Sequence, residues 1–179
     1  MRTFVSINVP REIGAYLEKI QRQIAHNNPD VKIKWVEPEN FHLCLQFIGE
    51  TSEIELNTLA DRLGQIIKFD PFQIGLTQLG CFPNRFEPRV LYVGAEEPIG
   101  KLFILQKKIR DFLLSRRYAL DLKPFKPHIT LGRLNYQTSF LNLPNELPNS
   151  FFSVHHVDLM KSQLTPRGPI YKSVVQYGE

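Results

Sequence analysis

The sequence predicts an α+β fold of two pseudo-symmetric lobes, each with an antiparallel sheet and helices, with a cleft between the lobes. Runs in which apolar and polar residues alternate, typical of half-buried strands, outnumber the amphipathic helical stretches. Most of these runs are separated by turns, which favours antiparallel over parallel pairing. A helical stretch followed by a histidine-bearing strand occurs twice, which indicates an internal duplication.

Composition limits the class of protein. A length of 179 residues fits one domain spanning 1–179, and a net charge of +4 with a pI near 9.1 suits a polyanionic partner without requiring one. The two cysteines, Cys44 and Cys81, have no CxxC spacing, so we expect free thiols in a reducing cytoplasm. The N-terminus resembles no signal peptide and no apolar run approaches ~18 residues, so neither secretion nor a membrane span is expected.

The first half of the chain is expected to contain three strands and two helices. Alternation predicts strands over 2–9, 31–35 and 40–49. Pro10 suits the first turn of one helix, and Ser52 and Glu55 form a capping box that begins the other. The apolar positions of the helices recur every three or four residues: Ile13, Leu17, Ile20 and Ile24, then Leu56, Leu59, Leu63 and Ile66.

The second half is expected to contain five strands and one helix. The helix follows Pro98 and turns Leu102, Leu105, Ile109 and Phe112 inward. Residues 81–88 are expected to form a turn-rich loop, and residues 135–150 a long surface loop. The strands are expected at 72–79, 89–93, 125–133, 152–164 and 169–177, with the turn Pro166–Pro169 between the last two.

Two histidine strands carry the same local pattern, His42-Leu43-Cys44-Leu45 and His128-Ile129-Thr130-Leu131. Since residues two apart in a strand share a face, each strand projects an imidazole and a small hydrogen-bonding group from one face. On the first strand we expect His42, Cys44 and Gln46 on that face, and Leu43, Leu45 and Phe47 in the core.

Two matched imidazoles indicate acid–base chemistry. A histidine pKa of about 6.5 lets one ring act as base while another acts as acid near neutral pH. Displacement at phosphorus needs such a pair on opposite sides, and a hydroxyl beside each ring can hold a phosphate oxygen. The other histidines, His26, His155 and His156, lack this context and are expected to be at the surface or structural.

The paired motifs, with Trp35 to Phe41 before the first and Phe125-Lys126-Pro127 before the second, resemble those of the two-histidine phosphoesterases. The closest branch is the RNA 2′,3′-cyclic phosphodiesterases, historically called 2′-5′ RNA ligases. Further matching marks are residues 2–7, residues 47–50, and residues 159–171 with their Gly168-Pro169-x-Tyr171 ending, so the likeness runs nearly end to end. This resemblance implies hydrolysis of a terminal 2′,3′-cyclic phosphate to a 2′-phosphate, without metal or other cofactor, and adds 2′-5′ RNA ligation as a second possible activity of the family.

The resemblance also implies roles. His128 would activate water as the base, His42 would protonate the departing 3′ oxygen, and Thr130, Arg133 and Cys44 would bind the phosphate. The family has threonine at the position of Cys44, and a thiol is a weak hydrogen-bond donor. Strict alternation places Arg133 on the face away from His128, so the strand must bend or end near Gly132 for Arg133 to reach the site.

Two alternatives remain open from the residues. His42, Cys44 and His128 could be zinc ligands of a metal-dependent hydrolase. The chain could instead be a non-catalytic module that binds RNA ends through basic side chains such as Lys123, Lys126, Arg133 and Arg167. On the enzyme interpretation, the expected partners are RNA ends or cyclic-phosphate nucleotides, with no membrane or metal, and the protein is expected to be a monomer.

Overall fold

The computed structural model describes residues 1–134, 141–145, 147–165 and 168–178, and it contains three α-helices, a short 3-10 helix and nine strands in those ranges. The helical elements are α1 (Arg11–Asn27), η1 (Pro38–Asn40), α2 (Glu53–Ile66) and α3 (Lys101–Ser115). The strands are β1 (Arg2–Asn8), β2 (Ile33–Trp35), β3 (His42–Glu50), β4 (Phe72–Phe82), β5 (Val90–Glu96), β6 (His128–Leu134), β7 (Phe151–Val154), β8 (His156–Thr165) and β9 (Gly168–Gly178).

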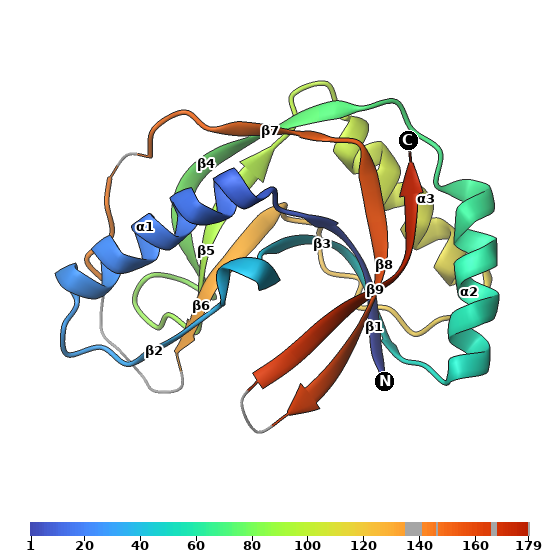
Figure 1. The fold of residues 1–179 in the computed structure, drawn as a ribbon, viewed down its shortest axis with the longest axis horizontal. Helices are drawn as coiled ribbons and strands as arrows, with labels where there is room; N and C mark the ends of the chain where they lie inside the picture. Colours follow the sequence, from blue (N-terminus) through green and yellow to red (C-terminus); the bar gives the residue numbers. More distant parts are fainter. Residues whose placement is uncertain (135–140, 146, 166–167, 179) are drawn as a thin grey trace.

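The strands form one curled sheet in the order β7-β4-β5-β6-β3-β1-β8-β9, with β2 added beside β6. Every pairing among the described strands is antiparallel. The sheet has two halves that meet where β3 pairs with β6; α1 lies along the half that contains β4, β5 and β6, and α2 and α3 lie beside the other (Figure 1). The predicted α+β class with two pseudo-symmetric lobes is therefore confirmed.

The core lies between the helices and one face of the sheet. Leu43 and Leu45 from β3 and Ile129 and Leu131 from β6 are almost completely buried there, as the alternation predicted. The capping box that begins α2 is also present, with the Ser52 hydroxyl accepting from the Glu55 backbone N–H. The opposite face of β3 and β6 is therefore free to carry the polar side chains of the two histidine motifs.

Both histidine strands contain a bulge after the histidine motif. On β3, Val5 pairs with Gln46 and Ser6 pairs with Cys44, so Leu45 between them has no partner on β1. On β6, an equivalent irregularity leaves Leu131 without a partner on β5. A bulge shifts the alternation by one residue. Phe47 was therefore wrongly predicted to be in the core: it is 50% exposed, while Gln46 turns inward and is buried.

Two further predictions need correction. The expected strand 152–164 is two strands: β7 pairs with β4 in one half of the sheet, and β8 pairs with β1 in the other. The connection 135–150 is not wholly at the surface, because Leu141 and Leu143 are buried against the core. Residues 135–140 of that connection, and Pro166 and Arg167 of the final turn, lie outside the described residues. None of the described helices has the length and apolar character needed to cross a membrane.

Candidate active site

The central strand pair fixes the positions of the two histidines. Leu43 pairs with Ile129 across β3 and β6. Continuing this antiparallel register places His42 opposite Thr130 and His128 opposite Cys44, all on the face away from the core. The two histidines are thus diagonal neighbours, for which a Cβ separation of about 7–8 Å is usual. This spacing leaves room for a phosphate between the rings.

Each imidazole is held by the backbone in the same way. The Nδ1 atom of His42 lies 2.7 Å from the carbonyl oxygen of Asn40, and that of His128 lies 2.6 Å from the carbonyl oxygen of Lys126. A carbonyl can only accept, so Nδ1 donates in both cases. The Nε2 atom of each ring is consequently the one that is available for proton transfer. No sequence pattern indicates these anchors, because any residue type supplies a backbone carbonyl.

Aromatic side chains hold the two rings from the sides. His42 contacts Phe4 and Tyr171, with 5.1 Å between ring centroids in both cases. His128 contacts Phe82 and Tyr92 at 4.9 and 5.4 Å. Such ring contacts restrict the rotation of an imidazole and reduce its access to water.

Their surroundings lower the pKa of both histidines. Burial is the main cause for each, and the hydrogen bonds to the carbonyls of Asn40 and Lys126 oppose it. Positive charge adds to the lowering: protonated His128 and Arg133 lower the pKa of His42, and Arg133 and Lys126 lower that of His128. Both rings are therefore largely neutral at pH 7, and a bound anionic phosphate would favour the protonated form.

A cavity of about 640 Å³ opens beside this pair. His42, Thr130 and Arg133 line it, and its walls come from residues 34–37 on one side and from the β8–β9 hairpin, including Tyr171, on the other. Its size suits a nucleotide. His128 and Cys44 do not line this cavity. The two histidines thus differ in their surroundings although their anchors are equivalent.

The bulge in β6 is what directs Arg133 into the cavity, so the bend that the sequence required near Gly132 is present. The carbonyl oxygen of the bulge residue Leu131 accepts from the Val36 N–H at 2.9 Å and from the buried side-chain amide of Gln21 at 2.8 Å. A Cβ at Gly132 would lie 2.6 Å from a side-chain atom of Ile33. Glycine is therefore needed for β2 to approach β6 this closely.

Cys44 is half-buried beside His128, and burial raises the pKa of its thiol to about 12. The thiol is thus neutral at any working pH. Its cross-strand partner on β1 is Ser6, whose buried hydroxyl has no hydrogen-bond partner among the described residues. His42, Cys44 and His128 do not form a metal-ligand group, and no other such group of His, Cys, Asp or Glu occurs in the described part of the chain. The geometry therefore gives no support to the zinc alternative.

Of the cations named for a binding module that the structure describes, only Arg133 lines the cavity. Lys126 lies over the Phe82 ring at 5.4 Å, and Lys123 is exposed and paired with Asp121. Arg167 lies outside the described residues. Tyr171 is a site residue that residue-by-residue reasoning did not single out; its only signal was the Gly168-Pro169-x-Tyr171 ending.

Fold and site together define a phosphoesterase of the two-histidine class. The family model described as LigT like phosphoesterase matches the chain twice, over residues 7–92 and 93–171, and the chain belongs to this family. A relative from Archaeoglobus fulgidus named RNA 2′,3′-cyclic phosphodiesterase is 33% identical over 97% of this chain and 98% of its own. One of the same name from Aquifex aeolicus is 33% identical over 99% of this chain and 96% of its own.

Solved structures agree. TT0787 of Thermus thermophilus is 32% identical and superposes with a TM-score of 0.83, covering 99% of this chain and 97% of that one. E. coli LigT complexed with 3′-AMP is 26% identical, also with a TM-score of 0.83 and the same coverage.

Proposed function

We propose that this protein is an RNA 2′,3′-cyclic phosphodiesterase that hydrolyses a terminal 2′,3′-cyclic phosphate to a 2′-phosphate. The observation that carries the proposal is the pair of histidines on adjacent antiparallel strands, each with Nδ1 bonded to a backbone carbonyl and Nε2 available. The names of the full-length relatives, and the 3′-AMP bound to E. coli LigT, support a ribonucleotide substrate.

His128 is the proposed base and His42 the proposed acid. The nucleoside would occupy the cavity of about 640 Å³, which His42 lines and His128 does not. The departing ribose oxygen would then lie beside His42, and water would approach from the side of His128. This asymmetry supports the same assignment that the family resemblance implies.

The proposed reaction is a single displacement at phosphorus. The water oxygen forms a bond to phosphorus while its proton moves to Nε2 of His128. The bond from phosphorus to the 3′ oxygen breaks, and protonated His42 gives that oxygen its Nε2 proton. Arg133, Thr130 and Cys44 would hold the non-bridging oxygens, the guanidinium offsetting their charge. Exchange with solvent then restores both rings.

Turnover of an RNA oligonucleotide ending in a 2′,3′-cyclic phosphate tests the proposal, with the product identified as a 2′- or 3′-phosphate. Hydrolysis to the 2′-phosphate, lost in His42→Ala and in His128→Ala, is expected. Binding without turnover would instead favour a non-catalytic module. We also propose that residues 1–179 form one domain, which the continuous sheet supports, and that the protein is a monomer. We further propose that it is cytoplasmic, which its two free cysteines support.

A further inference from the structure

We propose that the β8–β9 hairpin carries a second phosphate-binding surface, for the RNA chain upstream of the terminal nucleotide. The surface is centred on Lys161 and Lys172, the hairpin lysine pair. This inference rests on the proposed function, because it names the part of the same substrate that lies outside the catalytic cavity.

The first observation is the pairing of the two lysines. Lys161 and Lys172 are direct cross-strand partners on β8 and β9, so their ammonium groups lie on the same face of the hairpin. Like charges opposite one another destabilise a sheet. Neither lysine has a carboxylate within ion-pair distance among the described residues. The repulsion between these charges disfavours folding, and an anion between the two lysines would remove it.

The second observation is a hollow of about 380 Å³ that both lysines line, together with Met1, Glu53 and Ile170. Ile170 also lines the catalytic cavity, so the two hollows meet at this residue. Lys172 follows Tyr171 in β9, so the lysines lie on the opposite face of the hairpin from the cavity, beyond the edge strand β9. A chain whose 3′ end occupies the catalytic cavity would pass over β9 at Ile170 to bring an upstream phosphate to the hairpin lysine pair.

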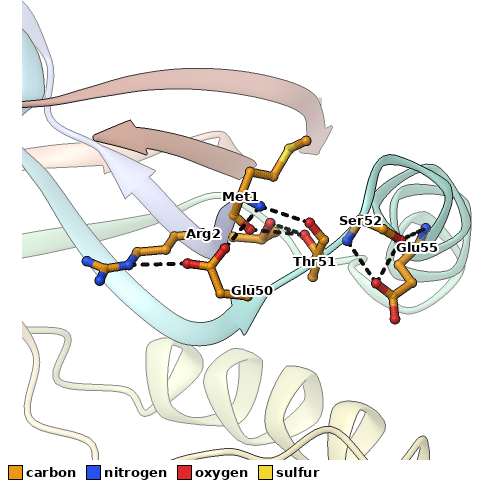
Figure 2. Close-up of polar contacts among 7 residues, drawn as sticks. Met1, Arg2, Glu50, Thr51, Ser52 and Glu55 are labelled. Atoms are coloured by element: carbon orange, nitrogen blue, oxygen red, sulfur yellow. Dashed lines mark hydrogen bonds and ion pairs between the residues drawn. The ribbon is translucent and has the colours of Figure 1, made fainter. Parts of the chain in front are cut away.

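The remaining charges at this hollow already have partners or a structural role. The α-ammonium group of Met1 lies 3.0 Å from the Glu50 carboxylate and donates to the carbonyl of Thr51, and Glu50 also pairs with Arg2 at 3.5 Å (Figure 2). Glu53 lies in the first turn of α2, where a negative charge is favourable. The two lysines are therefore the charges left for a ligand, and single-stranded RNA, with its regularly spaced phosphates, fits them.

The test compares two substrates in the double variant Lys161→Gln/Lys172→Gln. On a short oligonucleotide with a 2′,3′-cyclic phosphate, kcat/KM at low salt should fall roughly fivefold or more, because two lysine–phosphate contacts are lost. On a nucleoside 2′,3′-cyclic phosphate, which cannot reach the hairpin, it should stay within about twofold. The salt dependence of oligonucleotide binding should weaken, with a slope smaller by about 1.4 for two contacts to a single strand.

The matched control is Lys107→Gln/Lys108→Gln, which removes the same charge from exposed positions on α3, on the core side of the sheet. It should leave both substrates unaffected. The hairpin variant should also be at least as heat-stable as the wild type, because it loses a repulsive pair.

Equal kcat/KM of wild type and hairpin variant on the oligonucleotide would overturn the proposal. So would an equal loss of kcat/KM on both substrates in the hairpin variant, or the same loss on the oligonucleotide in the control variant. If the wild type hydrolyses neither substrate, the proposed function fails separately. Fluorescence anisotropy with a labelled oligonucleotide ending in a 3′-phosphate then decides the inference: weaker binding by the hairpin variant alone supports it, and unchanged binding overturns it.

Discussion

The substitution Cys44→Thr should raise catalytic efficiency. Cys44 lies on the site face of β3 opposite His128, where we propose that it faces a phosphate oxygen. A hydrogen bond from a hydroxyl to a charged acceptor is worth about 1.5–3 kcal/mol, and a thiol, as a weak donor, supplies about a third of it. The expected gain of about 1–2 kcal/mol corresponds to a roughly 5- to 30-fold increase in kcat/KM. Cys44→Ala should lose only about 2- to 5-fold on the same reasoning.

The same substitution should also stabilise the fold. The buried Ser6 hydroxyl is the cross-strand neighbour of Cys44 and has no hydrogen-bond partner among the described residues. The introduced threonine hydroxyl can accept from Ser6 while it donates to the phosphate, since a hydroxyl both donates and accepts. A new buried hydrogen bond is worth about 0.5–1.5 kcal/mol, or a Tm increase of about 1–6 °C for a chain of this size. Threonine is β-branched and suits a strand.

Steady-state kinetics on a cyclic-phosphate nucleotide and thermal unfolding measure the two effects separately. In the background Ser6→Ala the stability gain should disappear while most of the kinetic gain remains. A clear fall in kcat/KM for Cys44→Thr would refute the reasoning and indicate a positive role for the thiol. Because the pKa of Cys44 is raised to about 12, alkylating reagents at neutral pH should leave the wild type active.

Further expectations concern the rest of the site. His42→Ala and His128→Ala should each lose at least ~10²–10⁴ in kcat while folding normally. The lowered pKa values place both limbs of the kcat/KM bell below pH ~6.5: the rate falls on the acid side as the base is protonated and on the alkaline side as the acid is deprotonated. Arg133→Gln should weaken catalysis roughly 10- to 100-fold and move the bell to higher pH, because the guanidinium lowers both pKa values. Gln21→Leu removes the side-chain hydrogen bond to the carbonyl of Leu131. It should weaken catalysis and move the bell to higher pH in the same direction as Arg133→Gln, but by less. Activity should survive dialysis against EDTA, and loss that zinc restores would favour the metal alternative.

Most of the fold follows from local periodicity. Apolar residues spaced two apart indicate a strand, and those spaced three or four apart indicate a helix, from a short stretch of sequence alone. These spacings identified the three helices of the described residues and the two histidine strands. The sequence did not predict the interruption at His155 that divides residues 151–165 into β7 and β8. It arises because β7 pairs with β4 and β8 pairs with β1. That choice depends on segments far away in the sequence and leaves no mark in the alternation of residues 151–165.

The site was predictable to the extent that it repeats. His42, Thr130 and His128 were identified because the same motif occurs twice, and the antiparallel pairing of Leu43 with Ile129 brings the copies together. Alternation alone did not predict the bulges, because they depend on cross-strand register. Only the family resemblance required a bend near Gly132, where the Gln21 side chain supports the β6 bulge. The bulges explain both exceptions to simple alternation: Phe47 is exposed instead of buried, and Arg133 lines the cavity instead of turning away.

The two histidines have equivalent anchors, but only His42 lines the catalytic cavity. This difference allows a test of which histidine is the acid. An activated aryl leaving group departs from a phosphodiester without taking up a proton. Hydrolysis of such a substrate therefore needs the base but not the acid. If His42 is the acid, His42→Ala should regain most of the wild-type rate on this substrate, while His128→Ala should remain impaired by at least ~10²-fold. The cavity predicts this order because His42 lines it beside the proposed ribose position and His128 does not. Recovery in His128→Ala alone would reverse the assignment, and recovery in neither would mean that the aryl group is not placed beside either ring.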